Sequence, residues 1–355
     1  MSEISSAQNK SQLNYLKAIA AIFVVVGHCL TYLENYTTNI PFCGKMIGVL
    51  VSSVHVPLFF LIAGYLCHKQ PFRNYIRKKI IRLIVPYITF TVLKIAFSLF
   101  ISADHVHGDT VTEVLYDAFV IGGSYWFVYC MFFIYLLAPI IWRKSKEKLK
   151  TYNTRVIMIV IAMVIFNIAS IDLGIFSFPE ALKLGSFTAS TPFTQIERII
   201  MYFPYFAIGM LIRENEVSFN QFVVKIKAWC IFPLMVIAGI LGTCVVLDFF
   251  NKGYIVKMVI AFSLMLLLFY ATRYIPNNIK PCEVIGRDSL HIMFFDSFYR
   301  VMLYWIIAKI TSPNLLIAMI IAMLTVCLSV ISSEVIRKIP GVRVIFGLQS
   351  AKGTK

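Results

Sequence analysis

Charged residues are scarce in this chain, and their scarcity excludes most soluble folds. Only 14% of the 355 residues are Asp, Glu, Lys or Arg, whereas 59% are hydrophobic, and the mean hydropathy is +0.80. Soluble domains contain about 25% charged residues. No polar stretch is long enough to form a separate soluble domain. The composition therefore indicates a single polytopic membrane domain.

Paired cysteines and internal repeats are also absent from the sequence. The eight cysteines are scattered without a Cys-x-x-Cys pair, so neither a disulfide framework nor a cysteine metal site is indicated. Segment 104–117 carries acidic residues and histidines that could bind a metal, but a solvated loop is the preferred interpretation. We expect no metal cofactor.

The abundant apolar residues are gathered into runs long enough to cross a bilayer as helices. The ten runs are residues 13–33, 45–67, 80–103, 125–142, 155–170, 196–212, 228–247, 254–272, 289–308 and 314–336. They predict an all-α polytopic bundle of about ten transmembrane helices. Residues 1–12 are expected to form a cytoplasmic segment without a cleavable signal, residues 13–336 the membrane domain and residues 337–355 a basic cytoplasmic tail.

The distribution of basic residues predicts the orientation of this bundle. The chain has 33 basic and 17 acidic residues, for a net charge of +16. Most basic residues fall in alternate connections, and the other connections hold only Lys45, Lys183, Lys252 and Lys309. The positive-inside rule therefore places both termini in the cytoplasm. Basic connections of this kind face anionic lipid, and we expect no nucleic-acid partner.

Two polar residues within the first run are candidates for function. Lys17 and His28 are about three helical turns apart, so they face nearly the same direction and lie about 16 Å apart along the axis. Polar side chains in a membrane span normally face a protein interior or a water-filled path. The alternatives are that Lys17 only reaches the membrane rim and that His28 is a satisfied packing histidine.

The second run carries His55 near its middle, with Pro57 close behind it. The proline bends the helix and frees carbonyl groups that a neighbour must satisfy. His28 and His55 are expected at similar depths, so their imidazoles could meet in one cavity and act as general acid and base. The alternative is that His55 only hydrogen-bonds a carbonyl exposed by Pro57.

Basic residues gather where the third run begins. Lys79 and Arg82 are three residues apart, so they are expected to project on one side at the cytoplasmic mouth of the helix. Such a pair suits a phosphate-rich cytosolic ligand, because ammonium and guanidinium donors match phosphoryl oxygens. The alternative is a basic cluster that only fixes topology.

Taken together, these stretches resemble the acyltransferase 3 family of integral membrane acyltransferases. The matching stretches are Lys17-x10-His28, which resembles the family's Arg/Lys-x10-His; His55 to Tyr65, which resembles His-x-Pro-Leu-Phe-Phe-x-x-Ser-Gly-Tyr; Lys79 to Arg82 with Pro86, which resembles Arg-x-x-Arg before a proline; and segments 125–139 and 202–209. They occur in the family's order and cover nearly the whole chain.

The resemblance implies transfer of an acyl group, most often acetyl, from cytosolic acetyl-CoA to a hydroxyl of a cell-surface polysaccharide or its lipid-linked precursor at a bacterial inner membrane. It implies that His28 acts as the general base or handles the acyl group, and that Lys17, Lys79 and Arg82 hold the coenzyme. We expect His55 to share the catalysis. A transporter or export component for an envelope glycan, and a non-catalytic partner that has kept the fold, are the alternatives.

Two departures from the family pattern affect this interpretation. Ala63 replaces the usual serine before Gly64, which excludes a serine acyl-enzyme at that position. Asp296 replaces a late histidine in the ninth run, and Arg300 follows four residues later. An Asp296–Arg300 ion pair would make their burial tolerable. A helix-packing pair is the preferred interpretation, and acceptor recognition is the alternative.

Two further residues are expected near the outer face. Trp126 begins the fourth run, where it could anchor the helix at the membrane interface or stack on a sugar. Arg198 lies near the outer end of the sixth run, where it could bind an acceptor or a lipid headgroup. Both are candidate residues for binding the carbohydrate acceptor.

Overall fold

The computed structural model describes residues 2–67, 71–100, 115–142, 148–175, 181–184, 187–190, 193–249, 253–276 and 279–348. Of the candidate loop at 104–117, residues 104–114 lie outside the described residues. The chain divides into two compact units, which are described separately. Unit 1 comprises Met1–Ile62 and Ile212–Ser333, and unit 2 comprises Ala63–Leu211 and Glu334–Lys355.

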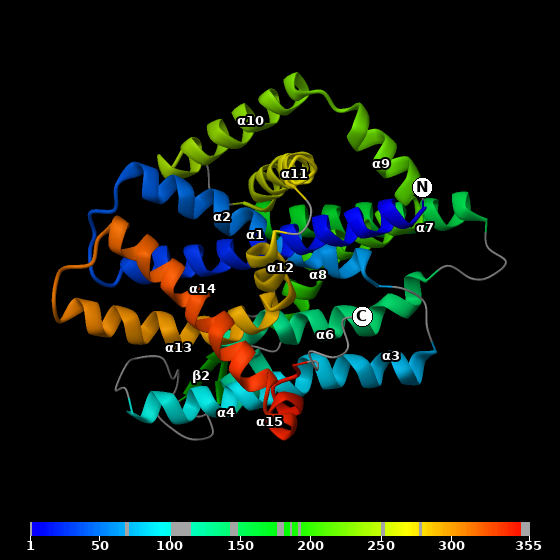
Figure 1. The fold of residues 1–355 in the computed structure, drawn as a ribbon. Helices are drawn as coiled ribbons and strands as arrows, with labels where there is room; N and C mark the ends of the chain where they lie inside the picture. The colour runs from blue at the N-terminus through cyan, green and yellow to red at the C-terminus, as the bar shows by residue number, and fades with distance from the viewer. Residues whose placement is uncertain are drawn as a thin grey trace. The chain divides into compact units, whose positions relative to one another are not determined.

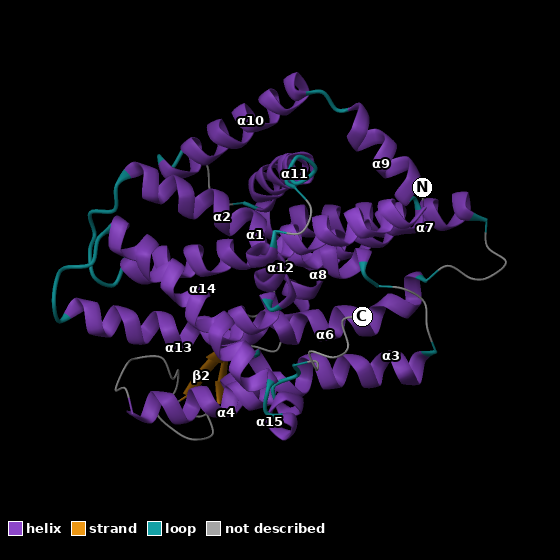
Figure 2. Cartoon of the chain, viewed as in Figure 1, coloured by secondary structure: helices purple, strands orange, loops and turns teal. Residues whose placement is uncertain are grey.

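Helices make up nearly all of the described chain (Figures 1 and 2), which confirms the predicted helical membrane bundle. Nine helices among the described residues are long and apolar enough to cross a membrane. The remaining predicted run, 196–212, lies in helix α8 (Phe193–Glu214), which carries charged residues near both ends and is not among the nine. Lipid offers the backbone no hydrogen-bond partners, so each spanning segment must satisfy its own amides as a helix.

Unit 1 is built around the N-terminal helix. Its elements are α1 (Ser2–Leu33), most of α2 (Phe42–Tyr65), α9 (Glu216–Lys225), α10 (Ala228–Val246), α11 (Tyr254–Ala271), α12 (Lys280–Arg287), α13 (Ser289–Ala308) and most of α14 (Leu315–Arg337). Helix α1 packs against α12 and α13, and α10 packs against α11 (Figure 1). Helix α1 is continuous through both Lys17 and His28, as their spacing requires.

The N-terminal half of α1 holds the segment that leads into α13. The Tyr15 hydroxyl donates to the carbonyl of Pro276 at 2.7 Å and accepts from the amide of Ile279 at 3.1 Å. Gly286 of α12 lies directly on α1, where an added Cβ would be 2.1 Å from the backbone oxygen of Asn14. These contacts fix the start of α13 against α1.

Unit 2 contains the remaining helices and one short hairpin. Its elements are α3 (Phe72–Lys79), the π-helix η1 (Ile80–Ile84), α4 (Val85–Phe100), η2 (Asp117–Ile121), η3 (Gly123–Tyr125), α6 (Trp126–Ile141), α7 (Leu149–Asn167), η4 (Ile168–Asp172), α8 and α15 (Pro340–Ile345), with strands β1 (Ala181–Leu184) and β2 (Phe187–Ser190). The two strands pair antiparallel (Figure 2). This hairpin is a small addition to the predicted all-α fold.

A second glycine allows a close helix approach in unit 2. An added Cβ on Gly64 would lie 1.9 Å from the backbone oxygen of Phe206. The end of α2 therefore packs backbone to backbone against α8 at this point, because glycine alone leaves room for such an approach. This contact joins two of the stretches that carry the family resemblance, and it explains the need for glycine in one of them.

Candidate active site

The site in unit 1 is centred on His28, which lies on α1 and contacts α13. Its Nδ1 atom is 2.7 Å from Oδ2 of Asp296. The His28 side chain is 48% exposed, whereas the Asp296 side chain is 2% exposed. The buried carboxylate thus holds one ring nitrogen and leaves the rest of the imidazole accessible.

Asp296 is the buried acidic residue on which this arrangement depends. Nε of Arg300 lies 3.4 Å from the same Oδ2 atom, which confirms the predicted Asp296–Arg300 pair. The other carboxylate oxygen, Oδ1, is buried and makes no hydrogen bond to any described residue. A buried carboxylate is costly unless positive charge compensates it. The guanidinium of Arg300 supplies that charge.

The hydrogen bond from Nδ1 determines what the imidazole can do. When Nδ1–H donates to Asp296, the other nitrogen, Nε2, carries the lone pair. Such a ring can accept a proton at Nε2, and the carboxylate stabilises the imidazolium that forms. The arrangement has the parts of a general acid–base pair.

His55 lies on α2 in the same unit. Its Nδ1 atom bonds the carbonyl oxygen of Val51 at 2.7 Å. This carbonyl belongs to the preceding turn and is not the one that Pro57 leaves without its helical donor, which is that of Ser53. The alternative in which His55 hydrogen-bonds a carbonyl exposed by Pro57 is therefore wrong about which carbonyl is bonded. His55 is half-buried and lies within the range of electrostatic interaction with His28.

Lys17 shares α1 with His28 and is half-buried. The continuous helix places it about 16 Å from His28 along the axis and on nearly the same face. The predicted spacing within the first helix is therefore confirmed. Its role in binding stays a prediction.

Lys79 occupies an aromatic cluster in unit 2. Its ammonium lies 3.3 Å from the ring centroid of Tyr135 and 5.4 Å from that of Tyr75. The Tyr75 hydroxyl donates to the carbonyl of Tyr135 at 3.0 Å, which fixes one ring against the other. A desolvated cation over aromatic faces gains about 2 kcal/mol. Lys79 is therefore held in a defined place at the start of η1.

The other basic residue of this pair is more open. Arg82 is exposed and lies within η1, close enough to Lys79 for their charges to interact. Single π-helical turns often occur at functional sites. Sequence reasoning predicted the pair of charges but not the π-helical turn between them or the tyrosines around Lys79.

Cys67 is a third polar group beside this cluster, in the connection between α2 and α3. Its Sγ atom lies 3.4 Å from the Tyr75 hydroxyl. Burial raises the pKa of the Cys67 thiol above its usual value. A thiol in this environment stays protonated and is a poor nucleophile, so it does not provide an alternative acyl-carrying group.

The two candidates for acceptor binding meet in unit 2. The guanidinium carbon of Arg198 on α8 lies 4.6 Å from the ring of Trp126 on α6. The Trp126 ring also stacks on Tyr202 with centroids 5.7 Å apart. The structure thus joins two residues that the sequence identified separately.

Asp296 is the candidate site residue whose main partner sequence reasoning missed. The local rule of four-residue spacing correctly paired it with Arg300. Its shorter contact is with His28, which is on a different helix and 268 residues away in the sequence. The available signal was a carboxylate in place of the family's late histidine, in a helix that also carries a buried cation.

Comparison with known proteins assigns the chain to a family. A sequence model of the acyltransferase domain matches residues 10–334, a range that includes both His28 and Asp296. The chain belongs to the acyltransferase 3 family. No curated protein and no solved structure matches it.

Membership of the acyltransferase 3 family makes the chain a multi-pass membrane acyltransferase. Acyl transfer to a hydroxyl needs a group that removes the hydroxyl proton, and His28 with Asp296 has that chemistry. No cluster of three or more His, Cys, Asp or Glu side chains suited to a metal ion occurs in the described part of the chain.

Proposed function

We propose that this acyltransferase moves an acyl group, with acetyl as the expected group, from cytosolic acyl-CoA to a hydroxyl of a cell-surface polysaccharide or its lipid-linked precursor. The proposed location is a bacterial inner membrane. The observation that carries the proposal is the 2.7 Å contact between Nδ1 of His28 and the buried carboxylate of Asp296.

The proposed reaction uses the open nitrogen of His28. As the acceptor oxygen attacks the thioester carbon, its proton passes to Nε2, and Asp296 stabilises the resulting imidazolium. The carbon–sulfur bond then breaks, and the proton returns to the departing CoA thiolate. A new ester and a free thiol result. A two-step route through an acyl intermediate on the protein is the alternative, and it needs the same proton transfers.

His55 is proposed as a second catalytic residue. Its Nδ1–H bond to Val51 leaves Nε2 as a hydrogen-bond acceptor. Because His55 lies near His28 in unit 1, it can orient the acceptor hydroxyl or a water in the same site. A weaker effect is expected from its removal than from removal of His28, because a backbone carbonyl rather than a buried carboxylate holds its Nδ1 atom.

Cations in both units are proposed to bind the acyl donor. CoA is a polyanion, and ammonium or guanidinium groups match its phosphates. Lys17 is the candidate in unit 1, and Lys79 and Arg82 are the candidates in unit 2. Trp126 and Arg198 are proposed to contact the carbohydrate acceptor.

The test is acyl transfer by His28→Ala in membrane vesicles. Radiolabelled acetyl-CoA is supplied, and ester-linked acetate on envelope carbohydrate is measured. We expect a loss of about 10²–10⁴-fold with unchanged membrane insertion. His291→Ala provides the control, because His291 is another histidine of unit 1, buried on α13, and is expected to retain transfer. Normal transfer by the His28 variant would refute the proposal.

The same vesicles distinguish the direct route from the two-step route. Protein incubated with labelled acetyl-CoA before acceptor is added will carry acid-stable label only if an acyl intermediate forms. In that case His28→Ala should remove the label. In the direct route, label should leave acetyl-CoA only when acceptor is present.

A further inference from the structure

The active-site face of α1 continues beyond His28 as a row of aromatic residues. Tyr32 and Tyr36 follow His28 at four-residue intervals, and Arg300 and Tyr304 follow Asp296 in the same way on α13. The guanidinium of Arg300 lies 5.0 Å from the ring of Tyr32. The rings of Tyr36 and Tyr304 stack with centroids 5.4 Å apart. Contacts between α13 and α1 with its following turn therefore continue from the His28–Asp296 pair to the Tyr36–Tyr304 pair.

Tyr36 is a fixed aromatic surface at the end of this row. Its neighbour Tyr304 is fully buried, and the Tyr304 hydroxyl donates to the carbonyl of Cys29 at 2.8 Å. Tyr36 itself is 39% exposed. A buried ring behind it and the exposure of its own ring give Tyr36 the character of a stacking platform.

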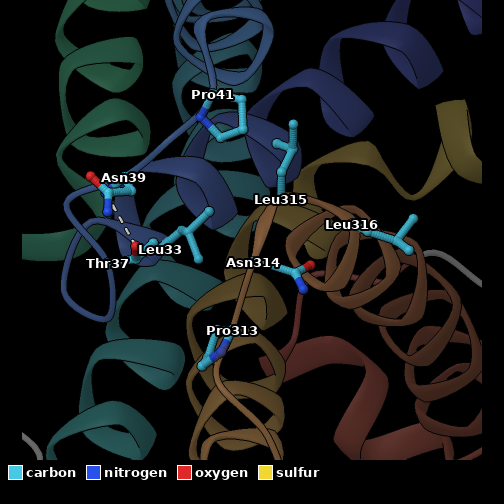
Figure 3. Close-up of a pocket in the computed structure, with 8 residues that line it drawn as sticks. All are labelled: Leu33, Thr37, Asn39, Pro41, Pro313, Asn314, Leu315 and Leu316. Atoms are coloured by element: carbon cyan, nitrogen blue, oxygen red, sulfur yellow. Dashed lines mark hydrogen bonds between the residues drawn. The ribbon is translucent and has the colours of Figure 1, made fainter.

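Thr37, the residue after Tyr36, lines a cavity of about 320 Å³ in unit 1. Figure 3 shows its lining, which comes from the end of α1 with the connection after it, and from the connection between α13 and α14 with the start of α14. The lining residues are Leu33, Thr37, Asn39, Pro41, Pro313, Asn314, Leu315 and Leu316. A cavity of this size falls within the range of small-ligand sites. The orientation predicted from the basic residues places it at the outer end of the unit.

The chemistry of the lining selects an uncharged, partly polar ligand. All eight lining residues are uncharged, and they combine apolar faces with a hydroxyl and two amides. Asn314 Oδ1 accepts the amide of Ile317 at 3.0 Å, which orients its amide group. A sugar ring offers the matching surface, since its C–H face is apolar and its edge carries hydroxyls. An anionic group would find no compensating charge in this lining.

We propose that this cavity and the Tyr36 platform bind a neutral sugar unit of the acceptor, on the outer side of the catalytic pair. The inference rests on the proposed acyl transfer to carbohydrate and adds the place and charge class of the acceptor. Leu33, the last residue of α1 and part of the cavity lining, lies about 8 Å along the helix axis from His28. The bound unit is therefore a neighbour of the acylated one rather than the acylated unit itself.

The first experiment captures the ligand whatever its chemical identity. The photocrosslinker p-benzoylphenylalanine is placed in place of Leu316, and in a second protein in place of Met323. Both residues are 70% exposed and lie on one face of α14, but only Leu316 lines the cavity. After irradiation in the native host, glycan on the protein is detected by periodate oxidation and hydrazide labelling.

We expect glycan at position 316 and none at position 323. Equal capture at both positions, or capture of lipid alone at position 316, would overturn the inference. The released glycan is also tested for charge. A captured glycan whose units are all acidic would contradict a neutral subsite.

The second experiment separates acceptor binding from chemistry. Tyr36→Ala is expected to raise the KM for vesicle carbohydrate at least tenfold while leaving the KM for acetyl-CoA unchanged, and Tyr36→Phe should retain the normal KM because the ring remains. Tyr274→Ala is the matched control, since Tyr274 is 69% exposed and packs against Tyr270 with the two rings tilted outside the site. An unchanged KM for carbohydrate in Tyr36→Ala would remove the acceptor role even if His28→Ala abolishes transfer, whereas full activity of His28→Ala would instead refute the acyl-transfer mechanism.

Discussion

The two units of this protein hold charged groups in a membrane bundle by different means. In unit 1, the buried carboxylate of Asp296 is bonded by His28 at 2.7 Å and approached by Arg300 at 3.4 Å. In unit 2, the ammonium of Lys79 is covered by tyrosine faces, the nearest with its centroid at 3.3 Å. One charge is balanced by ionisable partners, and the other by aromatic rings.

This difference separates a group suited to chemistry from a group suited to binding. An ionisable partner can exchange a proton, so the balance between Asp296 and His28 changes during a reaction. A ring face cannot exchange one, and a cation held over it keeps its position. We therefore expect changes near Asp296 to lower kcat, and changes at Lys79 to raise the KM for the acyl donor.

The largest effect is expected from Asp296→Asn, which tests the catalytic half of the comparison. The amide keeps the shape but removes the charge, and its NH₂ group can donate to Nδ1 and favour the wrong tautomer of His28. We expect kcat to fall about 10²–10⁴-fold, with little change in the KM for acetyl-CoA. Steady-state transfer in detergent-purified protein measures both constants.

The control for this change is Asp288→Asn. Asp288 is also 1% exposed and is paired with Arg287 at 2.8 Å, but it lies at the junction of α12 and α13. We expect a lower melting temperature and an unchanged kcat per folded protein. Equal losses of kcat in both variants would show that Asp296 has only a structural role.

The next largest effect is expected from Gly286→Ala, which tests whether the catalytic register depends on the α1–α12 contact. The new methyl group would lie 2.1 Å from the backbone oxygen of Asn14, and overpacking of this kind costs about 3 kcal/mol. We expect a lower melting temperature and reduced transfer, because a shift of α13 moves Asp296 away from His28. Thermal unfolding and transfer are measured on the same sample.

Gly239→Ala is the matched control for this glycine. Gly239 lies within α10, and an added Cβ there meets no atom within 4 Å. Alanine favours a helix over glycine by about 1 kcal/mol, so the control should be neutral or slightly stabilising. A Gly286 variant that is as stable and active as the control would show that α12 can shift without cost.

The sequence predicts which segments of this fold form helices better than it predicts which helices pack together. Apolar runs indicate spanning helices because lipid excludes unsatisfied backbone, and nine of the ten predicted runs coincide with helices that could span. Hydropathy cannot give the close contact of Gly286 with Asn14, because that contact depends on how two separate helices pack. The short hairpin at 181–190 also gave no recognisable signal.

The same limit applies to the candidate site. Helical periodicity places Lys17 with His28, and Asp296 with Arg300, because each pair shares one helix. It does not say that α13 lies against α1, so the pairing of His28 with Asp296 needs the structure. The ring closest to Lys79 was missed for the same reason, since Tyr135 comes from a different helix.

A smaller effect is expected from Lys79→Gln, which tests the binding half of the comparison. Loss of the cation removes a contact to donor phosphates, and we expect the KM for acetyl-CoA to rise about tenfold, equivalent to about 1.4 kcal/mol, with kcat nearly unchanged. Lys94→Gln is the control, because its ammonium also lies over a ring, that of Tyr125 at 5.9 Å. A fall in kcat without a change in KM would assign Lys79 to the chemistry and remove the contrast between the units.

The smallest effect is expected from the pair of Trp126 and Arg198, and it tests whether every cation–ring contact in unit 2 binds a ligand. The single variants Trp126→Leu and Arg198→Gln, with the double variant, form a cycle. If the pair contacts the acceptor, each change should raise the KM for vesicle carbohydrate about two- to fivefold, or about 0.5–1 kcal/mol. Coupling that appears only in the melting temperature, with an unchanged KM, would make Trp126 an interfacial anchor fixed by Arg198. The ligand-binding role of unit 2 would then rest on Lys79 and Arg82 alone. The cation–ring contact of Lys79 with Tyr135 would serve binding at one end of α6, and that of Arg198 with Trp126 would serve packing at the other.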